Sequence, residues 1–174
     1  MMVRIFLTGP PRCGKTTVLL KVVEELRKRG LKVGGITTPE VREAGRRVGF
    51  RVVDLYTGAS GRLAWAGLSS RFRVGKYGVD LEDFERVAVP ALERAVSECD
   101  VVCVDEIGKM ELYSRKFEEA LAEVLRSEKP VVATLHRTLV NRYRHLGEVV
   151  WVTPENRGHL SGRVVQKVLG GVKA

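Results

Sequence analysis

A glycine-rich loop near the N-terminus, GPPRCGKTT at residues 9–17, constrains the fold of this chain more than any other stretch. It fits the pattern G-x-x-x-x-G-K-[ST], which presents backbone N–H groups to the oxygens of a bound phosphate. A buried-type strand at residues 3–8 precedes it, and an amphipathic helix at residues 15–29 follows it. Because the motif requires this context, the sequence predicts an α/β protein with a phosphate site at the start of the helix.

The motif assigns roles to most of the loop. The donors expected to face the α- and β-phosphates are the N–H groups of Cys13, Gly14, Lys15, Thr16 and Thr17, where the helix dipole also favours anions. The Lys15 ammonium is expected to reach the β- and γ-phosphates, and the Thr16 hydroxyl to bind Mg²⁺. Pro10 and Pro11 precede these donors, so they stiffen the turn without deleting a needed N–H group.

Apolar runs of strand length alternate with amphipathic segments along the rest of the chain, which is typical of βα units around a parallel sheet. Further strands are expected at residues 32–38, 100–106, 130–136 and 148–153, and further helices at 81–98, 114–126 and 156–169. Pro90 lies inside the helix expected at 81–98. A kink or two consecutive helices are therefore expected there.

Residues 40–79 interrupt this rhythm with short extended segments, and we expect them to form an antiparallel element on the edge of the sheet. Four charged side chains surround a turn expected at Gly45, namely Glu40, Arg42, Arg46 and Arg47. They fit two interpretations. They either discourage pairing of an edge hairpin with other chains, or form a charged rim over the active site.

The second functional signal is a pair of acidic residues at the end of the strand expected at residues 100–106, which reads DVVCVDE. In a parallel sheet, the carboxyl ends of the strands lie at the edge where ligands bind. Asp105 is therefore a candidate Walker-B aspartate that holds Mg²⁺ together with Thr16. Glu106, the next residue, is a candidate general base that polarises a water for attack on the γ-phosphate.

Several arginines could stabilise the negative charge that develops on the phosphate oxygens in the transition state. Arg137, Arg142 and Arg144 lie between the last two strands, where some phosphate-loop kinases place a lid, and Arg157 follows the last strand. His136, at the end of the strand at 130–136, could sense the γ-phosphate or be an ordinary polar residue. No N-K-x-D element follows a strand, so base selectivity is expected to be loose.

Length and composition suit one domain that spans residues 1–174. No apolar run is long enough to cross a membrane, and the N-terminus is too short for a signal peptide, so we expect a cytoplasmic protein. The three cysteines, Cys13, Cys99 and Cys103, lack metal-site spacing. The net charge of +9 fits an RNA partner, a polyphosphate substrate or a heat-adapted surface rich in ion pairs.

Several stretches in order along the chain resemble the small P-loop nucleoside-triphosphatase family, which includes thermophile-type and cancer-related NTPases. They are GPPRCGKTT, TPEVREAGRRVGF, RVGKYGVDL, DEIGKMEL and TPENR. The resemblance implies a three-layer P-loop NTPase fold, similar to RecA-like and kinase-like proteins, and slow Mg²⁺-dependent hydrolysis of several nucleoside triphosphates. The nucleotide-binding residues it implies are Gly9, Pro10, Pro11, Arg12, Cys13, Gly14, Lys15, Thr16, Asp105, Glu106, Ile107 and Gly108. Many relatives have Gly or Val where this chain has Arg12 and Cys13.

The leading hypothesis is therefore a nucleoside-triphosphatase with Lys15 and Glu106 as catalytic residues and Mg²⁺ on Thr16 and Asp105. A small-molecule or nucleoside kinase is the first alternative, because it could use the same loop and carboxylate. An RNA-associated nucleotide switch is the second, motivated by charge alone, since no RNA-binding motif is visible. We expect a monomer without a membrane partner.

Overall fold

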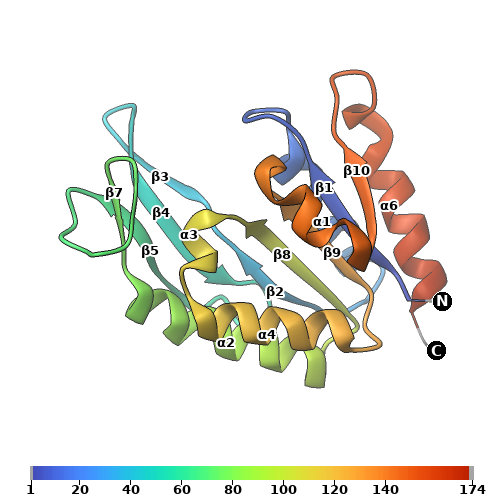
Figure 1. The fold of residues 1–174 in the computed structure, drawn as a ribbon. Coiled ribbons are helices and arrows are strands. Elements are labelled where there is room, and N and C mark those ends of the chain that lie inside the picture. Colours follow the sequence, from blue (N-terminus) through green and yellow to red (C-terminus); the bar gives the residue numbers. More distant parts are fainter. Residues whose placement is uncertain (1, 173–174) are drawn as a thin grey trace.

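The structure is a computed structural model that describes residues 2–172 (Figure 1). Its ten strands form one sheet, and the half nearest the termini is parallel. In spatial order the parallel strands are β10 (Glu148–Trp151), β1 (Arg4–Thr8), β9 (Val131–Leu135), β8 (Val101–Ile107) and β2 (Val33–Thr37). Strands β1 and β9 are buried along their whole length, as expected for parallel strands covered on both faces.

Two pairs of helices cover this sheet, which gives the three layers expected from the sequence (Figure 1). Helices α1 (Lys15–Lys28) and α6 (Arg157–Gly171) pack on one face. Helices α2 (Leu81–Glu98) and α4 (Arg115–Arg126) pack on the other. Each helix turns an apolar stripe inward; in α1 it consists of Val18, Leu19, Val22, Val23 and Leu26. Gly30 follows α1 with a φ of 83°, which ends the helix.

Helix α2 runs through Pro90 as one helix, so the expectation of two consecutive helices was wrong. A proline removes one N–H donor from a helix. Here the buried face continues on both sides of it, from Phe84 and Ala88 to Leu92 and Ala95. Packing of this face against the sheet outweighs the missing hydrogen bond.

Residues 40–79 form the antiparallel edge that the sequence predicts. The strands are β3 (Glu40–Glu43), β4 (Arg46–Asp54), β5 (Ser60–Ala66), β6 (Arg73–Val74) and β7 (Tyr77–Val79). They extend the sheet beyond β2, which pairs antiparallel with β4. The β3–β4 turn lies at Ala44 and Gly45, whose φ angles are 49° and 77°.

Four short helical segments were not expected. They are α3 (Lys109–Leu112), directly after β8, and η1 (Arg137–Leu139), α5 (Val140–Tyr143) and η2 (Arg144–Leu146), between β9 and β10. Each is too short to produce a helical apolar stripe. Ser114, expected inside the helix at 114–126, is instead the N-cap of α4, where its hydroxyl accepts the N–H of Phe117.

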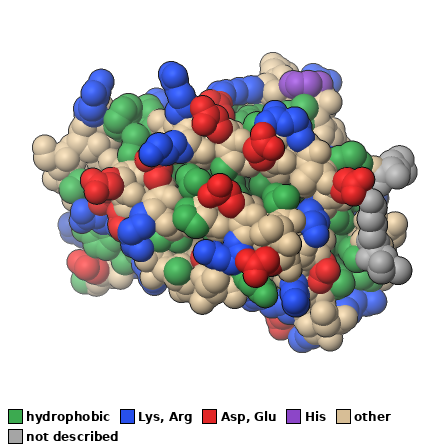
Figure 2. Space-filling model, turned by 90° about the horizontal axis from the view of Figure 1, so that it is seen from below, with side chains coloured by type: hydrophobic (Ala, Val, Ile, Leu, Met, Phe, Trp, Pro, Cys, Tyr) green, Lys and Arg blue, Asp and Glu red, His purple; other side chains and the backbone are tan. Residues whose placement is uncertain are grey.

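The face seen in Figure 2, below the sheet of Figure 1, carries acidic and basic side chains in an interspersed pattern. Such mixing suits a solvated surface. Within residues 2–172, no helix combines the length and apolar character needed to cross a membrane.

Candidate active site

The phosphate loop joins β1 to α1 and ends at Gly14, the N-cap residue of α1. Gly14 has a φ of 100°, which favours glycine because a side chain would strain the backbone there. Lys15, Thr16 and Thr17 form the first turn of α1, whose N–H groups have no acceptor inside the helix. They are therefore available to a phosphate.

Cys13 differs from the expected donor set. Its N–H group donates to the carbonyl of Pro10 over 3.1 Å, and its side chain is buried. This hydrogen bond closes a turn inside the loop, so we assign the Cys13 N–H to holding the loop's shape. Arg12 is exposed in the same turn and has a φ of 66°, a left-handed conformation that is costly for a side chain with a Cβ atom.

Asp105 lies near the carboxyl end of β8, is almost fully buried, and is surrounded by threonine hydroxyls. The Thr16 and Thr134 hydroxyls donate to its Oδ1 over 3.1 and 2.6 Å. The Thr37 hydroxyl donates to its Oδ2 over 3.0 Å. These residues come from α1, β9 and β2, so four elements that are distant in sequence fix one carboxylate.

The Thr16 and Asp105 oxygens suit Mg²⁺, which prefers hard oxygen ligands and is typically held by one or two protein groups plus phosphates and water. Their 3.1 Å separation lets one cation contact both. Among residues 2–172, no group of three or more His, Cys, Asp or Glu side chains is placed to hold a metal ion.

Glu106 follows Asp105 through a cis peptide bond. Its Oε2 lies 3.3 Å from the Nζ of Lys15, and both side chains are largely buried, with 27% and 13% exposure respectively. The two expected catalytic residues therefore pair with each other across the site. An incoming phosphate would compete with Glu106 for the Lys15 charge.

Glu111, in α3, is a third carboxyl group beside the site that we did not predict. Burial, then the nearby charge of Glu106, raises its pKa from the ordinary value of 4.5 to about 8. Its Oε2 lies 3.2 Å from the Thr38 hydroxyl, which also lies 2.9 Å from the backbone carbonyl of Asp105. Protonated Glu111 can thus donate to Thr38, and Thr38 to Asp105.

Gly108 lies between two of these carboxyl groups. A Cβ atom at Gly108 would come within 3.0 Å of Glu111 Oε1 and 3.4 Å of Glu106 Oε1. Ile107 is buried, and its carbonyl accepts the N–H of His136 over 3.0 Å. Ile107 and Gly108 therefore position the end of β8 through backbone and packing, rather than by offering polar side chains.

The remaining candidates contact different parts of the protein. The Arg142 guanidinium forms an ion pair with Glu118 of α4. The His136 Nδ1 is 2.8 Å from the hydroxyl of Thr138. The Arg157 side chain instead approaches the phosphate loop: its Cδ is 3.4 Å from where a Cβ atom at Gly14 would lie.

Sequence reasoning missed the threonines at positions 37, 38 and 134, and it missed Glu111. The sequence feature that could have identified the threonines is their place near the ends of predicted strands, where Asp105 also lies. Glu111 lies in DEIGKMEL. That segment carries part of the family resemblance, but its sequence offers no way to tell a buried carboxyl group from an exposed one.

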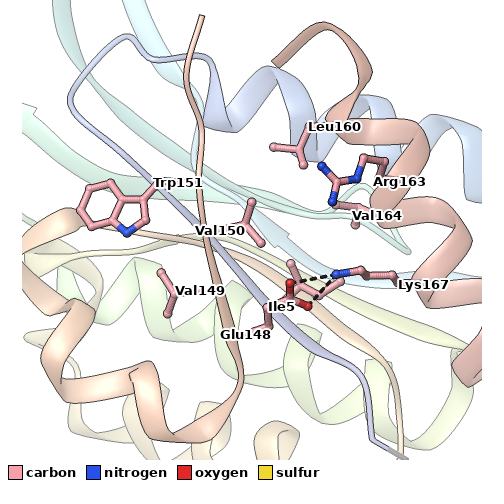
Figure 3. Close-up of a pocket in the computed structure, with 9 residues that line it drawn as sticks. All are labelled: Ile5, Glu148, Val149, Val150, Trp151, Leu160, Arg163, Val164 and Lys167. Atoms are coloured by element: carbon pink, nitrogen blue, oxygen red, sulfur yellow. Dashed lines mark hydrogen bonds and ion pairs between the residues drawn. The ribbon is translucent and has the colours of Figure 1, made fainter. Parts of the chain in front are cut away.

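A groove of about 260 Å³ lies elsewhere, between β10 and α6 (Figure 3). Val150, Leu160 and Val164 line it, and the Lys167–Glu148 ion pair of 2.8 Å crosses one end. It shares no lining residue with the phosphate loop or with Asp105. It is therefore separate from the candidate active site.

The fold, the loop between β1 and α1, and the aspartate near the end of β8 together define a P-loop NTPase fold with a nucleotide-type site. A family model described as NTPase matches residues 4–165. The chain belongs to this family.

Individual relatives agree with that assignment. Nucleoside-triphosphatase THEP1 of Pyrococcus abyssi is 50% identical over 170 residues, which cover 96% of this chain and 94% of the relative. The crystal structure of THEP1 from Aquifex aeolicus matches with a TM-score of 0.82 and 35% identity, covering 97% and 99% of the two chains. The solution structure of a human cancer-related nucleoside triphosphatase also matches with a TM-score of 0.82, at 38% identity, covering 98% and 100%.

Proposed function

We propose that this chain is a Mg²⁺-dependent nucleoside-triphosphatase that releases phosphate from several nucleoside triphosphates. Hydrolysis agrees with the names of its relatives. The observation that carries the mechanism is the pairing of Lys15 with Glu106 next to the Thr16–Asp105 pair. One edge of the sheet thus brings together the lysine, the threonine–aspartate oxygen pair and the glutamate that this mechanism uses.

In this mechanism the loop amides of the first turn of α1 and the Lys15 ammonium bind the triphosphate. Lys15 leaves its ion pair with Glu106 for the phosphate oxygens. The freed Glu106 carboxylate then orients a water toward the γ-phosphorus and accepts its proton as the new P–O bond forms. The bond from the γ-phosphorus to the bridging oxygen breaks, and the nucleoside diphosphate leaves.

Mg²⁺, when bound by Thr16 and Asp105, would supply positive charge to the phosphate oxygens as their negative charge develops. The threonines at 37 and 134 hold the Asp105 carboxylate in place for this role. The Glu111–Thr38 contact holds the backbone carbonyl of Asp105 in the same way.

The direct test is phosphate release from ATP, GTP, CTP and UTP, with and without Mg²⁺. We expect release from all four, and loss of release on chelation of the metal. Release confined to one base would contradict loose selectivity. Release that is unaffected by chelation would contradict the metal role of Thr16 and Asp105.

A kinase would use the same residues with an acceptor hydroxyl in place of water, so the assay is repeated with sugars, nucleosides and small alcohols. Hydrolysis predicts nucleotide consumption that is independent of these acceptors. Consumption that rises steeply with one of them, together with a phosphorylated product, would identify a kinase.

An RNA partner is a second candidate, and the antiparallel edge is the observation that favours it. Residues 40–79 carry three acidic and eight basic residues, and all eight basic side chains are exposed: Arg42, Arg46, Arg47, Arg51, Arg62, Arg71, Arg73 and Lys76. Phosphate backbones bind such surfaces in a salt-dependent manner. RNA that neither binds with salt dependence nor alters turnover would eliminate this candidate.

A further inference from the structure

We propose that Arg157, at the start of α6, binds the triphosphate group of the nucleotide in addition to Lys15. This inference rests on the proposed function, because it adds one contact to the same substrate.

Arg157 is the first residue of α6, and its side chain lies against the phosphate loop. Its Cδ is 3.4 Å, and one terminal nitrogen 4.0 Å, from where a Cβ atom at Gly14 would lie. Gly14 is the N-cap of α1, directly before the free amides of the first turn. A phosphate on those amides would be within reach of this guanidinium.

Hydrogen bonds within the turn before α6 fix the start of the helix. The Asn156 Oδ1 accepts the N–H of Thr153 over 2.9 Å, and the Thr153 hydroxyl accepts the N–H of Asn156 over 3.2 Å. The Asn156 Nδ2 donates to the carbonyl of Trp151 over 2.8 Å, and the N–H of Arg157 donates to the carbonyl of Thr153 over 3.0 Å. These hydrogen bonds stabilise the turn formed by TPENR. They fix the position of the first residue of α6, Arg157, beside the phosphate loop.

The charge of Arg157 is not neutralised by the protein. Within residues 2–172, its guanidinium makes no hydrogen bond or ion pair, and the first turn of α6 contains no acidic residue. A cation at a helix N-terminus is also opposed by the helix dipole. An anion bound at this place would satisfy both the guanidinium and the dipole, and the phosphate loop is built to hold one.

Arg142, the other arginine singled out from the sequence, is differently placed. It already pairs with Glu118, and its guanidinium lies 5.8 Å from the ring centre of Tyr143. Reaching the phosphates would require Arg142 to give up both contacts. Arg157 has no such contacts to lose.

The test compares binding of two probes to the wild-type protein and to Arg157→Ala, in the presence of Mg²⁺. One probe is a non-hydrolysable ATP analogue, and the other is inorganic tripolyphosphate, which has no base or sugar. Calorimetry should show that Arg157→Ala lowers the affinity for both probes by a similar factor of about 10 to 100. This is the range expected for loss of a charge-assisted hydrogen bond. Arg157→Lys should recover part of this loss, because it keeps the charge but not the fork of donors.

Arg163→Ala is the matched control, since Arg163 is an exposed arginine of α6 that lines the groove of Figure 3. It should bind both probes like the wild type. Unchanged binding in Arg157→Ala, or equal weakening in Arg163→Ala, would overturn the proposal. Loss confined to the ATP analogue would also overturn it, and would assign Arg157 to the base or the ribose.

Binding and turnover separate this proposal from the proposed function. If the chain binds both probes through Arg157 but releases no phosphate, hydrolysis is wrong and the contact stands. If phosphate is released and Arg157→Ala binds normally, the contact alone is wrong.

Discussion

The parallel and antiparallel halves of the sheet bring side chains together in different ways. In the parallel half, Asp105 is buried and receives hydrogen bonds from Thr16, Thr37 and Thr134, each on a different element. In the antiparallel half, the charged side chains of residues 40–79 are exposed except for Asp54, which is buried and pairs with Arg94 of α2 over 2.6 Å. Arg47, for example, donates to the Tyr77 hydroxyl over 2.8 Å and lies 3.7 Å from a carboxylate oxygen of Glu40.

The difference follows from how the strands are connected. A parallel pair needs a crossover, so the carboxyl ends of its strands collect residues from distant parts of the chain at one edge. Hairpins mostly pair chain neighbours, and apart from Asp54 their charges remain in water here. We therefore expect substitutions at the parallel edge to change catalysis, and those in the antiparallel half to change little.

The largest effect is expected from Glu106→Gln. The amide that replaces the carboxylate cannot accept a proton, so kcat should fall about 10²- to 10⁴-fold, the usual contribution of a general base. Nucleotide affinity should be retained, because the loop and Lys15 are intact. Single-turnover kinetics and calorimetry measure the two quantities.

Glu123→Gln is the control for this change, since Glu123 is an exposed residue of α4 that pairs with Arg126. It should behave like the wild type. Unchanged turnover in Glu106→Gln would remove Glu106 from the role of base.

Glu111→Gln should change how stability depends on pH. Between pH 4.5 and about 8, folded Glu111 keeps a proton that the unfolded chain loses. The free energy of unfolding of the wild type should therefore fall by up to about 1.4 kcal/mol per pH unit as pH rises through this window. A glutamine side chain does not titrate, so the variant lacks this contribution.

Denaturant unfolding of both proteins at pH 5, 6, 7 and 8 measures the effect. The groups that face Glu111 are the carboxylates of Glu106 and Asp105 and the hydroxyl of Thr38, and all remain in the variant. The stability of the variant relative to the wild type should rise with pH. Parallel curves would show that Glu111 titrates normally.

Arg12→Gly and Ala44→Gly test the same backbone strain in the two halves. Among residues 2–172, these are the two non-glycine positions with positive φ, at 66° and 49°. Glycine should relieve the strain, with a gain of about 1 kcal/mol in the free energy of unfolding at each site. Equal gains with unchanged nucleotide affinity would place Arg12 in solvent, whereas weaker binding in Arg12→Gly alone would make Arg12 a phosphate contact.

Arg46→Ala should have the smallest effect. Arg46 is exposed at the start of β4, and surface substitutions of this kind change stability by about 0.5 kcal/mol or less. Turnover should also be unchanged if the charged β3–β4 hairpin only discourages edge pairing. A marked fall in kcat would instead support a charged rim over the active site. It would contradict the expectation that substitutions in the antiparallel half leave catalysis unchanged.

Most of the fold could be predicted because apolar periodicity and the loop motif are local signals. The strand at 100–106 and the helix at 15–29, for instance, correspond to β8 (Val101–Ile107) and α1 (Lys15–Lys28). Two consecutive helices, one of the two alternatives expected at Pro90, did not form, because buried contacts on both sides keep α2 continuous. Helices as short as α3 leave no periodic signal.

The sequence alone determined that a phosphate loop stands between a strand and a helix, that Asp105 and Glu106 follow a buried strand, and that residues 40–79 are antiparallel. Each of these depends on neighbours along the chain. Only the tertiary structure decided that three threonine hydroxyls converge on Asp105, that Glu111 is buried beside Glu106, and that Arg157 lies over Gly14. These contacts depend on strand order and register. The partners of a side chain at a strand end come from the neighbouring strands, which the sequence alone does not identify.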